Sequence, residues 1–212
     1  MNALSRMNLS RLEYVGQMDA GDEEKYTSII APLDDYGHGN ILVNWLPDSD
    51  EYYRTGFLYC AQHLADDILA KLGGAEALVY PMLYCFRHFM ELCCKRIIAL
   101  GFEVGYCTEP KKNHDLRTLW TIAREVIECA PFADLEWERV RIECLVDEFE
   151  RLDKSSTALR YATNRDGQPS LGKSLFKINV QSFADHAECV GSSLTSYARM
   201  MQAIVLRAKR GE

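Results

Sequence analysis

The chain has 212 residues, of which 48% are hydrophobic and 26% are charged, a composition typical of a globular protein with a sizeable core. Its net charge of -7 repels a phosphate backbone at long range, which argues against broad coating of nucleic acid, although a local basic pocket could still bind RNA. The sequence has no run of about 18 uncharged apolar residues and no secretory pattern at its N-terminus, so we expect a cytoplasmic protein without a membrane span.

Residues 1–48 show no clear helical period and contain the acidic, turn-rich segments DAGDEEKY and PLDDYGHGN. We expect them to form an N-terminal arm, and residues 49–212 to form a helical bundle. The first predicted helix follows the arm, because apolar residues recur there at spacings of three and four. Its end is predicted at the Gly73-Gly74 pair.

The second predicted helix contains the segment YCFRHFMELCCKRIIALG. It begins at Ala75 or at Tyr80, and the later start is favoured by Pro81, because proline is tolerated in the first turn of a helix. Gly101 is predicted to close it. The expected buried face consists of Leu83, Phe86, Met90, Cys93, Ile97 and Leu100.

Three further helices are predicted. The third opens at NHDLRTLW and stops at Pro131, the fourth runs from about Asp134 to Asp153, and the fifth from about Gln181 to Lys209. Between the last two, the segment LRYATNRDGQPSLGKSLFKINV loses the helical period and is predicted to form a loop or small irregular hairpin. The fold class expected is therefore all-α, an antiparallel bundle of about five helices.

A polar strip is predicted on the second helix, because positions three, four and seven apart are neighbours on a helix surface. The strip consists of Tyr84, Arg87, His88, Glu91 and Lys95. One interpretation is a structural ladder of ion pairs. The other is a site at which the arginine and the lysine contact phosphate and the histidine transfers protons.

The order of three motifs resembles the HEPN-like superfamily of helical prokaryotic proteins. The motifs are the Arg-His pair followed by glutamate and lysine in the second helix, the His-Asp-Leu start of the third, and an Arg-Tyr loop ending in Asp-Gly; in this chain they comprise Arg87, His88, Glu91, Lys95, His114, Asp115, Leu116, Arg160, Tyr161, Asp166 and Gly167. The resemblance implies a helical bundle, frequently dimeric, and an RNA-linked role in a defence, toxin–antitoxin or stress system. The usual ribonuclease motif of the family, an arginine followed by a histidine four to six residues later, is absent from this sequence.

From the strip and the resemblance we predict His88, Arg87 and Glu91 as the catalytic residues, if the chain is an enzyme. The residues predicted to bind ligand or RNA are Lys95, His114, Arg160 and Tyr161. The expected function is binding of RNA, a nucleotide or a protein partner, with a homodimer as the expected assembly and no cofactor. Two alternatives stay open: a metal-independent ribonuclease with a non-standard site, and a purely structural scaffold or dimerisation module.

Eight cysteines are present, and in a chain without a secretory signal we expect them to be reduced. Three cysteine–histidine pairs are separated by three residues, a spacing that can hold zinc, but the second half of a metal motif is missing, and no metal site is predicted. At least one of the adjacent Cys93 and Cys94 is expected to be buried and inert.

Overall fold

The computed structural model describes residues 49–109, 113–131, 136–154, 156–172 and 176–211. The predicted N-terminal arm lies outside the described residues. The described part contains five helices, α1 (Ser49–Leu69), α2 (Ala75–Glu103), α3 (Leu116–Cys129), α4 (Glu136–Asp153) and α5 (Val180–Arg210). The predicted all-α fold is confirmed for these residues.

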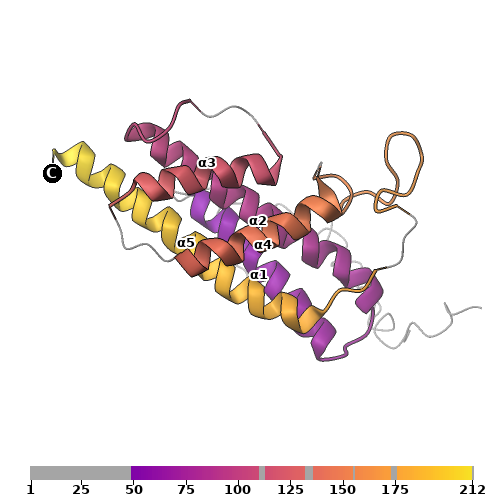
Figure 1. Cartoon of the computed structure of the whole chain (residues 1–212). Helices are drawn as coiled ribbons and strands as arrows, with labels where there is room; N and C mark the ends of the chain where they lie inside the picture. The colour runs from indigo at the N-terminus through magenta and orange to yellow at the C-terminus, as the bar shows by residue number, and fades with distance from the viewer. Residues whose placement is uncertain (1–48, 110–112, 132–135, 155, 173–175, 212) are drawn as a thin grey trace, which may run out of the picture. The chain divides into compact units, whose positions relative to one another are not determined.

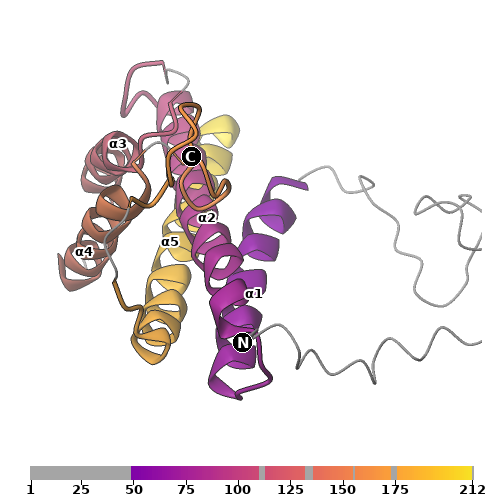
Figure 2. The same ribbon diagram turned by 90° about the vertical axis from the view of Figure 1, so that its right-hand side faces the viewer.

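Helix α2 is the central element of the bundle (Figures 1 and 2). It packs against α1, α3 and α5, while α4 packs against α3 and α5. Seen along the turned view of Figure 2, α1 lies on one side of α2 and the α3–α4 pair on the other. Because α2 is enclosed by three helices, polar residues on it become buried unless they face a gap between neighbours.

The predicted apolar faces form the core. All six positions expected to be buried on α2 are buried, and Leu119, Trp120 and Val126 of α3 are buried as well. The prediction is less accurate at the end of the first helix, which stops at Leu69, before the two glycines. Leu72, which shares the helical spacing of the buried residues, is exposed because the chain has already turned there, and Leu69, the last residue of α1, is exposed as well.

The start of α2 is the earlier of the two predicted positions, and its end differs from the prediction. The helix begins at Ala75, so Pro81 lies in its interior. Proline has no N–H to donate to the helix, but Pro81 is exposed, so the effect on the packed face of α2 is limited. The prediction that Gly101 closes the helix is wrong, since α2 continues to Glu103. Gly101 instead allows α3 to approach, because a Cβ at this position would lie 2.5 Å from Cγ1 of Val126.

The segment after α4 is an irregular hairpin, as predicted, held by a single isolated bridge between Thr163 and Pro169. Its start is fixed by the buried carboxylate of Asp153, which accepts hydrogen bonds from the backbone N–H groups of residues 157, 158 and 159 at 2.7, 2.9 and 3.2 Å. This anchoring places the following Arg160 beside α2.

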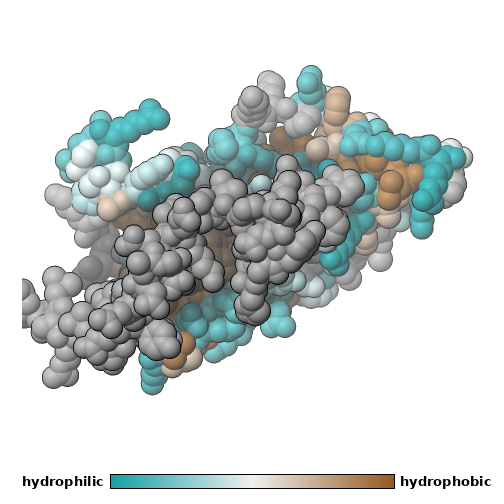
Figure 3. Space-filling model, turned by 180° about the vertical axis from the view of Figure 1, so that it is seen from behind, coloured by the Kyte–Doolittle hydropathy of each residue, from teal (hydrophilic) through white to brown (hydrophobic). Residues whose placement is uncertain are grey.

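No helix in the described part of the chain has the length and apolar content needed to cross a membrane. Seen from behind, the described part of the surface mixes hydrophilic and hydrophobic residues (Figure 3).

Candidate functional site

The centre of the candidate site is a buried ion pair on α2. The guanidinium of Arg87 is 0% exposed, and its Nη1 donates to Oε2 of Glu91 at 3.0 Å. Its other donors reach two backbone carbonyls: Nε donates to Asp153 at the end of α4 (3.1 Å), and Nη2 donates to His114 just before α3 (3.0 Å). Arg87 therefore joins three helices. Because its side chain is buried, a dissolved ligand cannot contact it directly.

The other oxygen of the Glu91 carboxylate organises two partly exposed residues. Oε1 accepts a hydrogen bond from Nζ of Lys95 at 2.7 Å and lies 2.8 Å from Nδ1 of His114. Glu91 is 1% exposed, whereas the side chains of Lys95 and His114 are 35% and 71% exposed. We assign the proton of His114 to Nδ1, because a carboxylate only accepts hydrogen bonds; Nε2 is then directed away from Glu91.

The charges at this site keep Glu91 ionised. Burial by itself raises the pKa of the Glu91 carboxyl, but hydrogen bonds from Lys95 and His114, with the charges of Lys95 and Arg87, outweigh it and lower the pKa overall. Two cations and one carboxylate leave the group with a net charge of +1, which becomes +2 when His114 is protonated. The exposed end of this group, formed by Lys95 and His114, is thus positive, although the chain as a whole is acidic.

His88 belongs to a different cluster. Its ring lies edge-on to Phe57 of α1, with 4.5 Å between centroids, and is stacked on Tyr84 at 5.6 Å. The guanidinium of Arg160 lies over the rings of Tyr84 and Tyr161, at 5.9 and 5.5 Å, and its Nε donates to the Ser156 carbonyl. Burial is the main cause that lowers the pKa of His88.

The predicted strip is therefore divided into two groups. Arg87, Glu91 and Lys95 join His114, while His88 joins Arg160 and Tyr161 through Tyr84. The division follows from the helix itself, because His88 is rotated by one residue from Arg87 and faces α1.

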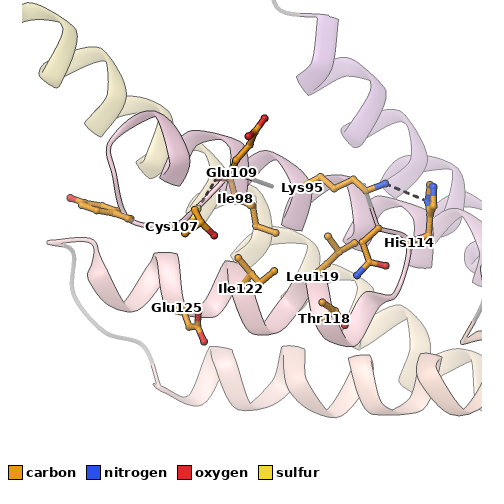
Figure 4. A pocket seen from close by; sticks show the side chains of 12 residues that line it. Lys95, Ile98, Cys107, Glu109, His114, Thr118, Leu119, Ile122 and Glu125 are labelled. Atoms are coloured by element: carbon orange, nitrogen blue, oxygen red, sulfur yellow. Dashed lines mark hydrogen bonds between the residues drawn. The ribbon is translucent and has the colours of Figure 1, made fainter. Parts of the chain in front are cut away.

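A pocket of about 1040 Å³ opens beside the Lys95–His114 pair, between α2, α3 and their connector (Figure 4). Lys95 and His114 lie at one end, with the contact between them drawn as a dashed line, and Ile98, Leu119 and Ile122 line the middle. A volume of this size accommodates a small organic ligand, and its lining combines an apolar wall with a few polar groups.

Acidic groups limit what the pocket can hold. Glu109 and Glu125 line it, and they oppose a second or third phosphate. The N-terminus of α3 is already occupied, because the Asp115 side chain accepts the Thr118 N–H at 2.7 Å and caps the helix. Among the described residues that line the pocket, the basic side chains are therefore Lys95 and His114.

Comparison with protein-family models, curated proteins and solved structures finds no match for this chain.

The cysteines do not form a metal centre in the part of the chain that the structure describes, where no group of three or more His, Cys, Asp or Glu side chains could hold an ion. Both Cys93 and Cys94 are buried, and burial raises their pKa values, that of Cys93 to about 12. The prediction that at least one of them is buried is confirmed.

Sequence reasoning placed His114 near the strip but did not find its bond to Glu91. It also missed the pocket, whose wall includes Tyr106, Cys107 and Thr108 from the α2–α3 connector. No sequence signal marks these three as lining residues, because their position depends on how the connector returns across α2.

Proposed function

We propose that this chain binds a phosphate group of an RNA or a nucleotide at the Lys95–His114 end of the α2–α3 pocket. The observation that supports the proposal is the shared bond of both residues to one buried oxygen of Glu91, which holds them side by side at the pocket. Binding sites of this kind use side chains fixed in advance, so that little rotamer entropy is lost when the ligand binds.

The acidic pocket wall favours a ligand with one phosphate at the positive end. A nucleotide would place its phosphate against Lys95 and its base against Ile98 and Ile122; an RNA would use one end or one unstacked nucleotide. The net charge of -7 fits this limited contact better than a long charged interface.

The HEPN-like resemblance supplies the proposed setting. The chain acts in a prokaryotic defence, toxin–antitoxin or stress system, as a homodimer or with a protein partner. The Arg87 network has a positioning part in this proposal, because it fixes Glu91, which in turn fixes the two exposed residues.

RNA cleavage is a second candidate, favoured by the Glu91–His114 pair. A carboxylate on Nδ1 leaves the Nε2 lone pair of a neutral imidazole available as a base. In such a reaction Nε2 of His114 removes the proton of a 2′-hydroxyl, the oxygen attacks the adjacent phosphorus, and the charge of Lys95 stabilises the phosphorane. The phosphorane then expels the 5′-oxygen of the next nucleotide, which takes a proton from water, and a 2′,3′-cyclic phosphate remains. Proton transfer then belongs to His114, whereas the sequence assigned it to His88, whose ring is packed between Phe57 and Tyr84.

The binding proposal is tested by fluorescence anisotropy with a labelled single-stranded RNA and by calorimetry with an adenosine nucleotide. Lys95→Gln and His114→Asn should each weaken binding by about tenfold or more, since hydrogen bonds to charged groups contribute about 1.5–3 kcal/mol. The matched control is Lys209→Gln, which also removes a lysine paired to a glutamate of α2, although neither residue of that pair lines the pocket. Equal weakening in the control, or no binding by folded wild type, would reject the binding proposal and favour the structural scaffold as the function.

The cleavage candidate is tested with the same RNA, labelled at one end, in the presence and absence of a chelator. Loss of cleavage in His114→Asn but not in His88→Asn would support it. Binding without cleavage by the wild type would reject this candidate and leave the binding proposal intact.

A further inference from the structure

A second pair of reactive groups lies where α1 packs against α2. The thiol of Cys85 on α2 donates a hydrogen bond to Sγ of Cys60 on α1, with 3.5 Å between the sulfur atoms. Cys60 is exposed and Cys85 is buried. A disulfide bond requires the sulfurs to approach to about 2.05 Å, about 1.5 Å less than their present separation.

We infer that Cys60 and Cys85 are a thiol pair that a small disulfide oxidant converts into a reversible cross-link between α1 and α2. The exposed Cys60 thiolate attacks one sulfur of the oxidant, forms a mixed disulfide and releases the first thiol. Cys85 then loses its proton and attacks Sγ of Cys60, which forms the protein disulfide and releases the second thiol. Two protein thiols are oxidised and one small disulfide is reduced, so the electrons balance.

The environment of the two sulfurs assigns the order of these steps. Burial, followed by the hydrogen bond with Cys60, raises the pKa of Cys85 to about 12, so Cys85 is a poor first nucleophile in water. Once Cys60 carries a mixed disulfide, Cys85 is already in contact with the sulfur that it must attack. Closing the bond then requires the two sulfur atoms, now 3.5 Å apart, to approach by about 1.5 Å.

Among the described cysteines, Cys60 and Cys85 are the pair whose sulfur atoms share a hydrogen bond, although Cys107 and the exposed Cys129 also lie close enough to interact electrostatically. Cys93 and Cys94 are both buried, adjacent in the helix and out of reach of an oxidant. Cys144 is exposed on α4. It therefore serves as a control thiol of similar exposure on a different helix.

The experiment treats the full reduced chain with oxidised glutathione and follows the intact mass and a non-reducing peptide map. In wild type and in Cys144→Ser, the peptides that contain Cys60 and Cys85 should be linked, and together they should be lighter by two hydrogens. Cys60→Ser should form no link, whereas Cys85→Ser should stop at a mixed disulfide of glutathione on Cys60. Cys60→Ser changes an exposed residue, so it remains informative even if Cys85→Ser fails to fold.

The oxidised wild type should also melt about 5–10 °C higher than the reduced form, because the bond closes a loop in the unfolded chain. Oxidant treatment should leave the melting temperature of Cys60→Ser unchanged. The inference is overturned if Cys60 and Cys85 both remain open to alkylation after treatment. It is equally overturned if wild type retains glutathione on Cys60, or if Cys60 is linked to any other cysteine.

Discussion

Oε1 of Glu91, a nearly completely buried carboxylate oxygen, lies 2.8 Å from Nδ1 of His114, whose side chain is 71% exposed. The same carboxylate binds buried Arg87 through its second oxygen. A structural ion pair and an exposed pair of polar residues are thus joined in one group. Changes at its centre should affect stability first, and changes at its exposed end should affect binding first.

Replacing Arg87 by methionine should destabilise the fold by about 3–5 kcal/mol, the usual cost of leaving one charge of a buried pair without its partner. Two backbone carbonyls, of Asp153 and His114, would also lose their donor. Urea unfolding measures the difference. The double variant Arg87→Met with Glu91→Leu should lose less than the sum of the single changes, and strict additivity would contradict the coupling.

Glu91→Gln should flatten the acid dependence of stability. Folding lowers the pKa of Glu91, so its contribution is fully present above the unfolded carboxyl value of about 4.3 and is lost as the pH falls through the lower folded value. Between about pH 3 and pH 5, the free energy of unfolding of the variant should therefore fall less steeply than that of wild type. The exposed Glu188→Gln should retain the wild-type slope, and equal slopes in all three proteins would contradict the prediction.

His88 should make the protein less stable at mildly acidic pH. Its pKa is lowered by folding, chiefly through burial, so below the unfolded value of about 6.5 the unfolded state binds the proton more readily. The stabilisation is present above that value and is lost as the pH falls through the folded pKa. His88→Phe keeps an aromatic ring between Phe57 and Tyr84, and its melting temperature should change less between pH 7 and about pH 5. A direct NMR titration of His88 that gives a raised pKa would contradict this.

Two glycine substitutions should change the free energy of unfolding in opposite directions. Gly101→Ala places a Cβ 2.5 Å from Cγ1 of Val126 and should cost about 1–3 kcal/mol through overpacking between α2 and α3. Gly56→Ala on α1 meets no atom within 4 Å and should stabilise by about 0.5–1 kcal/mol, because alanine loses less backbone entropy in a helix. Thermal unfolding compares them, and Val126→Ala should partly rescue Gly101→Ala. A neutral Gly101→Ala would show that the two helices can separate freely.

The sequence predicted the elements because their determinants are local. The apolar stripe of α2, the start of α3 in NHDLRTLW and the loss of the helical period after α4 are all read within one or two helical turns, and the structure confirms the helices and the irregular hairpin that they indicate. Gly101 was misread because a glycine at a helix end and a glycine at a helix crossing look alike in one sequence. Only the position of Val126, 25 residues away, distinguishes them.

The spacing of Arg87, Glu91 and Lys95 was sufficient to predict their ion pairs, since neighbours at four residues meet on any helix. Tertiary structure decided the rest. The helices packed around α2 bury Arg87, and the connector to α3 places His114 beside Glu91. The packing of α1 against α2 places Phe57 against the ring of His88 and Cys60 against Cys85. Those contacts depend on which helix covers which face, a property of the packed bundle that no short stretch of sequence contains.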